Sequence, residues 1–244
     1  MSLAGIFTAI IIAMSVVPFL GYIPLGFMNA TIIHVPVIIG AIILGPKYGA
    51  YLGLVFGVTS LVKATIAPGV TSFVFSPFVT IGGYSGNMWS AVIAIVPRVC
   101  IGIVAYFVYK LIMKAAHGIK GSQTVALWVA GIAGAMTNTL LVMNGIYIFF
   151  GQSYAAASNK AVEHIYDVIL GIILGFGIPE AIVAGILTTA ITKVLFKIMK
   201  DTADRKEPVI YEYLSEAWCG SFRKKIRYKK VRAAENNNAA ASII

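Results

Sequence analysis

Arg98 is the residue of this sequence whose type and position call most clearly for a chemical explanation. It follows Pro97 directly, inside a long apolar run. A charge near the centre of a bilayer costs about 2.5–3.5 kcal/mol, so such residues usually face an interior or a cavity and have a partner. Pro97 lacks a backbone N–H, which leaves the carbonyl of Ile93 without a partner inside the helix. The sequence therefore indicates that Arg98 lies inside the protein and interacts there with an anionic group.

Glu180 is the other ionisable residue well inside an apolar span, and it follows the stretch "GFGIP" at residues 175–179. We expect this stretch to form a turn, with Pro179 at the start of the sixth apolar helix. Two interpretations of the charges remain open. Either Arg98 and Glu180 pair only with each other, or Arg98 binds an anionic ligand while Glu180 orients the arginine or contacts ligand hydroxyls. A guanidinium suits a carboxylate because it can donate two parallel hydrogen bonds.

Amide, hydroxyl and aromatic side chains accompany these charges, some within the fifth apolar span and some just before the fourth. Such a combination is typical of a small-molecule pocket. The alternatives are that the asparagines join helices and that the tryptophan belongs to the aromatic belt at the membrane surface. The predicted ligand-binding residues are Arg98, Asn87, Trp89, Tyr84, Asn138, Asn144, Tyr147 and Glu180.

The elements that must position these residues are predicted to be membrane helices. The chain is 59% hydrophobic and 11% charged, with a mean hydropathy of +0.89, and soluble domains carry about a quarter charged residues. We predict an all-α integral membrane protein with a compact bundle of six transmembrane helices. The expected spans are residues 4–22, 32–45, 48–63, 90–113, 124–150 and 177–199.

The distribution of positive charge predicts how this bundle lies in the membrane. The net charge is +10. With both termini in the cytoplasm, all Lys and Arg residues except Lys63, Arg98 and Lys160 lie on the cytoplasmic side, in accord with the positive-inside rule. The basic balance therefore reflects topology and attraction to anionic lipid, and it gives no reason to expect a nucleic-acid partner.

Three long connections are expected on the outer side, at residues 17–32, 64–89 and 151–179. They contain prolines, glycines and aromatic residues, and loops of this length within a compact domain are usually functional or disordered. Their aromatic and apolar content argues against disorder. We expect them to be ordered and to cover a cavity that opens to the outside, although they could simply cap the bundle.

Several functional classes are disfavoured. The two cysteines provide neither a disulfide framework nor a metal site, and no Gly-rich phosphate-binding loop is present, so any ATP hydrolysis requires a partner. The motif "GYSG" at residues 83–86 matches that of rhomboid intramembrane proteases. Catalysis there needs a histidine close to Ser85, and His117 is expected on the opposite membrane face. A stand-alone secondary carrier remains an alternative, although we see no clear inverted repeat.

Four sequence segments carry a resemblance to a known family. They are the small-residue motif "AIIIA" (residues 9–13), the hairpin "IHVPVIIGAIILGPKYGAYLGLVFGVTSLV", the segment "TSFVFSPF" and the phrase "IPEAIVAGILTTAI". Over residues 4–200 the chain resembles the substrate-binding S components of energy-coupling factor (ECF) vitamin importers. It is most similar to the pantothenate branch, and a pyridoxine or hydroxymethylpyrimidine importer is the alternative within the family.

The resemblance implies a non-catalytic subunit in a prokaryotic cell membrane. Such a subunit binds a vitamin from outside, docks on a transmembrane coupling subunit that carries two cytosolic ATPases, and topples to release its cargo. The resemblance implies that Ala9 and Ala13 contact the coupling subunit. It implies no cofactor on this chain and no metal. Pantothenate carries a carboxylate, an amide and two hydroxyls, which suits an arginine with amide and tyrosine partners.

The last part of the sequence is predicted to be separate from the membrane domain. We divide the chain into a membrane domain at residues 1–200 and a basic cytoplasmic tail at residues 201–244. The stretch "FRKKIRYKKVR" could lie on anionic lipid, and the last residues have a composition typical of disorder.

Overall fold

The computed structural model describes residues 2–17, 21–24, 29–157 and 165–204, and it is mainly helical. The chain divides into a unit Met1–Val194 and a unit Leu195–Ile244. The predicted tail lies almost entirely outside the described residues. The helices are α1 (Leu3–Val16), α2 (His34–Leu44), α3 (Pro46–Ile66), α4 (Met88–Ala115), α5 (Ser122–Ala157), α6 (Ile165–Ile172) and α7 (Ile178–Asp204).

Each of the six predicted spans contains an apolar helix among the described residues, with α6 and α7 forming one continuous helix at the last span. The first span is shorter than predicted, because α1 ends at Val16 and Tyr22 belongs to strand β1 (Tyr22–Pro24). Among the described residues, four helices are long and apolar enough to cross a membrane: α3, α4, α5 and the helix Ile165–Asp201, which combines α6 and α7. α1 and α2 are apolar but have only 14 and 11 residues. That these two helices also span the membrane, and that both termini are cytoplasmic, stay predictions.

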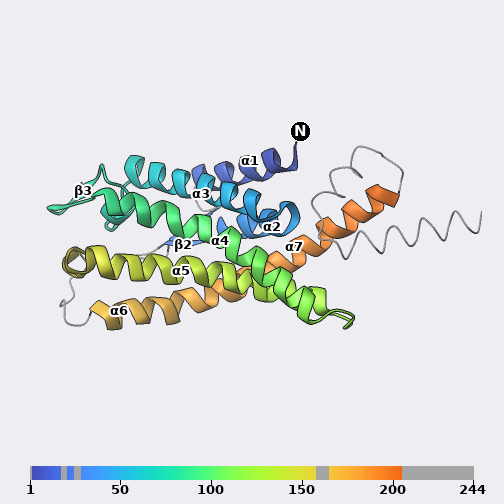
Figure 1. The fold of residues 1–244 in the computed structure, drawn as a ribbon. Coiled ribbons are helices and arrows are strands. Elements are labelled where there is room, and N and C mark those ends of the chain that lie inside the picture. Colours follow the sequence, from blue (N-terminus) through green and yellow to red (C-terminus); the bar gives the residue numbers. More distant parts are fainter. Residues whose placement is uncertain (1, 18–20, 25–28, 158–164, 205–244) are drawn as a thin grey trace, which may run out of the picture. The chain divides into compact units, whose positions relative to one another are not determined.

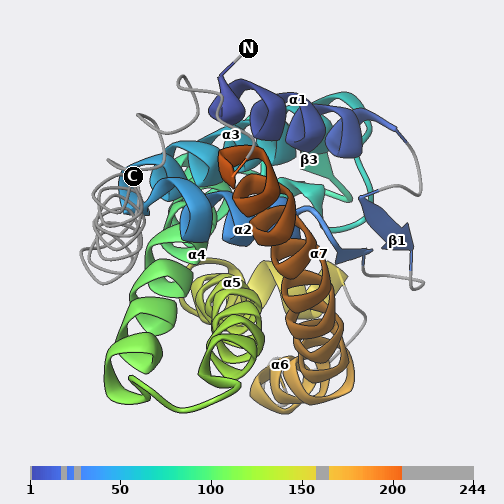
Figure 2. The same ribbon diagram turned by 90° about the vertical axis from the view of Figure 1, so that its right-hand side faces the viewer.

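α2 is the central helix of the first unit. Ten of its eleven residues are buried. It packs against α1, α3, α4 and α5, and Figures 1 and 2 show it enclosed by these helices. A helix that is apolar on all sides is stable when it is surrounded on all sides. This central position brings His34, the first residue of α2, into the interior.

A row of glycines brings α3 into direct contact with the backbone of α4. Gly49, Gly53 and Gly57 recur every four residues and therefore lie on one face of α3. A Cβ atom on Gly53 would overlap the carbonyl oxygen of Arg98. Small residues permit such close approach of membrane helices. The glycine row therefore fixes the height and rotation of α4 at Arg98.

Two of the outer connections contain short hairpins. The first holds strands β1 (Tyr22–Pro24) and β2 (Asn29–Thr31), which pair antiparallel. The second holds a short 3₁₀ helix (Ser72–Val74) and the antiparallel strands β3 (Thr80–Ile81) and β4 (Tyr84–Ser85). Residues 18–20 and 25–28 of the first connection lie outside the described residues.

The third outer connection differs from the prediction, because most of residues 151–179 is helical. α5 continues to Ala157, and α6 begins at Ile165. The turn expected at "GFGIP" is also wrong, since residues Ile173–Gly177 form a π-helical turn that joins α6 to α7. Pro179 has no N–H for the usual hydrogen bond to residue 175. The shifted bond from the Ile178 N–H to the Ile173 carbonyl keeps the helix continuous across this position.

An apolar cluster holds the outer ends of these helices together. Phe73 and Val74 of the 3₁₀ helix pack with Ile93 of α4 and with the second half of α5. Ile165, Ile169 and Ile172 of α6 complete the cluster. The long apolar stretch that the prediction assigned to a loop is thus a helix because it buries one side against this cluster.

Candidate functional site

Arg98 lies in the interior, as predicted, with 6% of its surface exposed. Its Nη1 donates a hydrogen bond to the carbonyl oxygen of Ile93 at 2.8 Å. This is the carbonyl that Pro97 leaves without a backbone donor, so the proline creates the acceptor that holds the guanidinium. The guanidinium carbon also lies 5.2 Å from the ring centre of Phe75 and 5.6 Å from that of Phe56. Aromatic faces attract cations at such distances.

Glu180 lies on the first turn of α7, directly after the π-helical turn. Its Oε1 accepts a hydrogen bond from the backbone N–H of Thr31 at 3.3 Å and lies 3.5 Å from Nδ1 of His34. The carboxylate thus links α7 to the end of β2 and the start of α2. The side chain of Glu180 retains 14% exposure.

A cavity of about 390 Å³ lies beside Glu180. Its walls come from the segment around the start of α2 and from the region of the π-helical turn and α7. Most of its lining is apolar, with Thr31, His34 and Glu180 as the polar groups. The residues that line it are Thr31, Ile32, His34, Val35, Gly175, Phe176, Pro179, Glu180, Val183 and Ala184.

The two charged groups, Arg98 and Glu180, each contact neighbouring groups within the described residues. Arg98 contacts the Ile93 carbonyl and two aromatic rings, whereas Glu180 contacts Thr31 and His34. The positive charge of Arg98 nevertheless acts favourably on the Glu180 carboxylate. Other groups thus contribute to holding each charged side chain in place.

Asn138 is the predicted asparagine that faces the interior. It lies on α5 with 7% exposure, and its Oδ1 is buried without a hydrogen-bond partner among the described residues. A buried amide oxygen in this condition costs free energy unless a ligand or water satisfies it. Asn138 is thus well suited to accept a hydrogen bond from a bound molecule.

Asn144 and Tyr147 are exposed residues on the second half of α5. Nδ2 of Asn144 donates to the Leu140 carbonyl of its own helix at 2.7 Å. Tyr147 makes an edge contact with Tyr166 of α6, with ring centres 5.6 Å apart. The structure does not bring these two residues together with Arg98, and their ligand contacts stay predictions.

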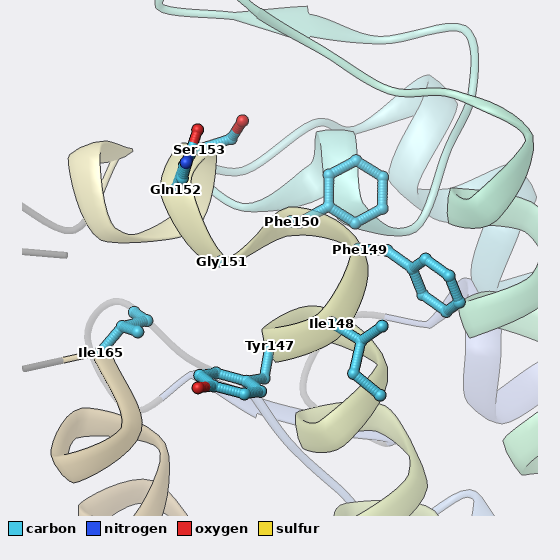
Figure 3. Close-up of a pocket in the computed structure, with 8 residues that line it drawn as sticks. All are labelled: Tyr147, Ile148, Phe149, Phe150, Gly151, Gln152, Ser153 and Ile165. Atoms are coloured by element: carbon cyan, nitrogen blue, oxygen red, sulfur yellow. The ribbon is translucent and has the colours of Figure 1, made fainter. Parts of the chain in front are cut away.

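A second and larger cavity, of about 520 Å³, lies at the outer end of α5 beside the start of α6. Figure 3 shows Tyr147 pointing toward Ile165, whereas Phe149 points away from it. Among the residues that the structure describes, the lining of this larger cavity includes no charged side chain. We therefore take the smaller cavity beside Glu180 as the candidate site, because its lining includes a carboxylate and a buried histidine. Arg98 and Asn138 are not among its lining residues.

The three predicted residues that precede or begin α4 have well-defined structural roles. Asn87 caps α4, since its side chain accepts the Trp89 N–H at 2.9 Å and its own N–H donates to Ser90. The Trp89 ring stacks on Phe149 at 4.0 Å and is about half exposed. Tyr84 packs against Phe73 of the outer cluster. These contacts order the outer surface above Arg98, and direct ligand contacts stay predictions.

Ala9 and Ala13 lie four residues apart on α1, and both are exposed. They therefore share an outward face of this helix. Ser15, on the same helix, is buried and hydrogen-bonds to Thr59 of α3 at 3.0 Å. Within the described residues, no other element therefore covers the side of α1 that carries the two alanines.

Two contacts of the site were missed by the sequence reasoning. The sequence analysis assigned no ligand-binding role to His34, and the Thr31 backbone was not considered. The signal that could have identified His34 is a polar residue at the start of an otherwise apolar helix. Ser85, the serine of "GYSG", shares a hydrogen bond with Thr80 at 3.0 Å, and among the described residues its hydroxyl is not bonded to a histidine.

Comparisons with known proteins identify relatives over most of the chain. The family "ECF transporter, substrate-specific component" matches residues 2–192. The "Pantothenic acid transporter PanT" of Lactococcus lactis subsp. cremoris is 41% identical over 172 residues, which cover 70% of this chain and 79% of that protein. The "Pantothenate transporter PanT" of Leuconostoc mesenteroides subsp. mesenteroides is 30% identical over 198 residues, covering 79% and 89%.

Among solved structures, the S component for biotin from an ECF-type ABC transporter matches with a TM-score of 0.41 and 19% identity, covering 78% of this chain and 88% of that one. The family match extends over all the helices that build the candidate site, from α1 to most of α7. The chain belongs to the substrate-specific components of ECF transporters.

Proposed function

We propose that this chain is the subunit that captures pantothenate for an ATP-driven ECF importer. The observation that carries the proposal is the 41% identity to a protein named as a pantothenic acid transporter, over 79% of that protein. A second relative of the same name matches over 89% of its length. The chain itself acts without catalysing a reaction, and ATP hydrolysis belongs to partner ATPases.

The chemistry of the interior supports an anionic, hydroxyl-bearing ligand. Arg98 offers a buried cation whose guanidinium is already held by the Ile93 carbonyl and two aromatic rings. A preorganised guanidinium loses little entropy when it binds a carboxylate. Asn138 contributes a buried acceptor, and Glu180 lines a cavity of about 390 Å³. In the proposed complex, Arg98 binds the carboxylate, and the other groups serve the amide and the hydroxyls.

The proposed setting is a prokaryotic cell membrane with both termini in the cytoplasm. The ligand is taken from the outside and is released after the chain docks on a transmembrane coupling subunit. Ala9 and Ala13 lie on the proposed docking face, and their exposure on α1 supports this. Two cytosolic ATPases supply the energy, in accord with the absence of a phosphate-binding loop from this sequence.

The test is pantothenate binding by the purified chain and by the variant Arg98→Gln. We expect tight binding by the wild type and about 100-fold weaker binding by the variant, because removing one partner of a buried, charge-assisted contact costs about 2–5 kcal/mol. Isothermal titration in detergent measures both affinities. Uptake into vesicles should require the coupling subunit and the ATPases as well.

The matched control is Lys110→Gln, which removes an exposed cation from the same helix. We expect its affinity to equal that of the wild type. A wild-type chain that does not bind pantothenate contradicts the proposed ligand. Uptake by this chain alone, without ATP, contradicts the proposed mechanism and favours a secondary carrier. Unchanged affinity of Arg98→Gln would leave the arginine as a structural residue only.

A further inference from the structure

The carboxylate of Glu180 is held in one orientation at the wall of the cavity. Its Oε1 is engaged by the Thr31 N–H at 3.3 Å and faces Nδ1 of His34 at 3.5 Å. Glu180 lines the cavity and retains some exposure. Because a carboxylate has two acceptor oxygens, Oε2 is the atom that is left to receive a hydrogen bond from a molecule in the cavity.

The imidazole of His34, next to the Glu180 carboxylate, is buried with few hydrogen bonds. The side chain is 1% exposed, and neither ring nitrogen makes a hydrogen bond of good geometry with the described residues. Its Nδ1 lies 3.5 Å from Oε1 of Glu180. Burying an imidazole with such poor hydrogen bonding costs free energy relative to an apolar residue of similar size. A structural role in packing α2 would be served better by an apolar side chain.

The two residues face the same cavity from different helices. His34 begins α2, the most deeply buried helix, and Glu180 follows the π-helical turn at the start of α7. π-helical turns inside α-helices occur frequently at functional sites. The turn lengthens the helix by one residue relative to regular α-helical spacing, so it sets the direction in which Glu180 projects.

The charge of this wall determines which part of a ligand it accepts. A carboxylate accepts hydrogen bonds from hydroxyl or N–H groups and repels another carboxylate. Arg98, whose guanidinium is positively charged, has the opposite preference. In a complex that uses the Glu180 wall, a ligand with a carboxylate at one end and a hydroxyl at the other would therefore lie with its hydroxyl toward Glu180 and its carboxylate away from it.

We propose that His34 positions Glu180 so that Oε2 accepts a hydrogen bond from the hydroxyl end of the ligand, and that this pair sets the orientation of the ligand. The inference rests on the proposed function, because pantothenate has its primary hydroxyl and its carboxylate at opposite ends. Glu180 is the contact residue, and His34 is a positioning residue that acts through it.

The experiment compares three ligands on the full-length chain by isothermal titration. They are pantothenate, an analogue without the primary hydroxyl, and the alcohol analogue in which a hydroxymethyl group replaces the carboxylate. For the wild type we expect about a tenfold loss on removing the hydroxyl, corresponding to one charge-assisted hydrogen bond. The replacement of the carboxylate should weaken binding more strongly, because it removes the contact with Arg98.

The variants His34→Phe and Glu180→Gln should lose the discrimination between pantothenate and the deoxy analogue. His34→Phe keeps an aromatic ring, somewhat larger than imidazole, and removes both nitrogens, so we expect the affinity ratio between pantothenate and the deoxy analogue to fall close to one. His34→Asn can restore a hydrogen-bond donor near the position of Nδ1. It should therefore recover part of the wild-type difference in affinity between pantothenate and the deoxy analogue. All three variants should bind the alcohol analogue more weakly than pantothenate by the same factor as the wild type. Arg98→Gln should instead lose this difference and keep the wild-type difference between pantothenate and the deoxy analogue.

The matched control is Thr188→Val, which removes a buried hydroxyl on α7 that makes no side-chain hydrogen bond among the described residues and lies outside the cavity lining. It should behave as the wild type with every ligand. If the wild type does not bind pantothenate, the proposed function is wrong, and this inference fails with it. If the wild type binds pantothenate, and the His34 and Glu180 variants keep the wild-type ratio of affinities for pantothenate and the deoxy analogue, only this inference is wrong. Should His34→Phe not fold, His34→Asn and Glu180→Gln decide the same comparison.

Discussion

At the scale of single residues, the position of Arg98 depends on the proline before it. In a regular helix, the N–H of residue 97 would donate to the carbonyl of residue 93. Pro97 cannot do so, and Nη1 of Arg98 takes that acceptor at 2.8 Å. The proline thus converts a missing backbone hydrogen bond into an anchor for a buried cation. Such an anchor lowers the cost of burying the charge and fixes the guanidinium for a ligand.

The variant Pro97→Ala tests this anchor. The new N–H at position 97 can compete with Arg98 for the Ile93 carbonyl, so we expect pantothenate to bind about fivefold more weakly, equivalent to roughly one hydrogen bond. The thermal unfolding midpoint should not fall, because the helix gains a backbone hydrogen bond. Titration and thermal unfolding in detergent measure the two effects.

The control for this experiment is Val96→Ala, at an exposed neighbouring position on α4. Its pantothenate affinity should match that of the wild type. An unchanged affinity of Pro97→Ala would show that the proline contributes nothing to the placement of Arg98.

At the scale of elements, the site depends on how closely the helices approach one another. α3 presses its glycine face against α4, and a Cβ on Gly53 would meet the Arg98 carbonyl oxygen and, at 2.8 Å, the Cα of Val99. α7 is aligned by the π-helical turn that accommodates Pro179. The cation and the carboxylate therefore come from two helices whose positions are set by backbone contacts and by a local change in helical spacing.

Gly53→Ala should disturb the site through α4. The added methyl group must push the two helices apart, and overpacking of this kind costs about 1–3 kcal/mol of stability. Because the overlap is with the backbone of Arg98, we expect pantothenate affinity to fall as well. Thermal unfolding with and without pantothenate measures both quantities in one assay.

Gly171→Ala on α6 is the matched comparison, since a Cβ there meets nothing within 4 Å. The exchange of an open helical glycine for alanine is expected to be favourable by about 0.5–1 kcal/mol. If both variants behave alike, the close approach of α3 to α4 does not govern the position of Arg98.

At the scale of the whole molecule, binding and energy coupling are expected to use different surfaces. Arg98, Asn138 and His34 are buried within the first unit and Glu180 is partly buried there, whereas Ala9 and Ala13 are exposed on α1. A subunit of an importer must keep its ligand inside while it engages a partner from outside. Variants on one surface should therefore leave the function of the other intact.

The double variant Ala9→Leu with Ala13→Leu tests this separation. We expect pantothenate binding to the isolated chain to be unchanged, and ATP-dependent uptake with the coupling subunits to fall by about tenfold or more. The reason is that bulky side chains prevent close helix–helix approach at the proposed docking face. Titration and vesicle uptake give the two readouts.

Ala190→Leu provides the same change at an exposed alanine of α7 and should leave both readouts at the wild-type level. Full uptake by the α1 double variant would remove Ala9 and Ala13 from the proposed docking face. A loss of ligand binding would instead show that α1 supports the cavity directly.

The sequence by itself determined the class of the protein and several local features. The membrane character and the approximate helix positions follow from composition and apolar run length, which are local properties. The burial of Arg98 was predictable for the same reason, since a cation in an apolar run must avoid lipid. The family was recognisable from short segments, and the match over residues 2–192 confirms it.

The tertiary structure alone decided which polar residues meet. In a membrane helix, the lipid-facing and interior faces are both apolar, so hydrophobic periodicity does not show which side of α5 faces inward. Asn138 faces inward and Asn144 does not, although both lie in the same apolar run. The contact between Thr31 and Glu180 joins residues 149 positions apart. His34 lies beside Glu180 because α2 is packed at the centre of the bundle, and no local pattern encodes that neighbour.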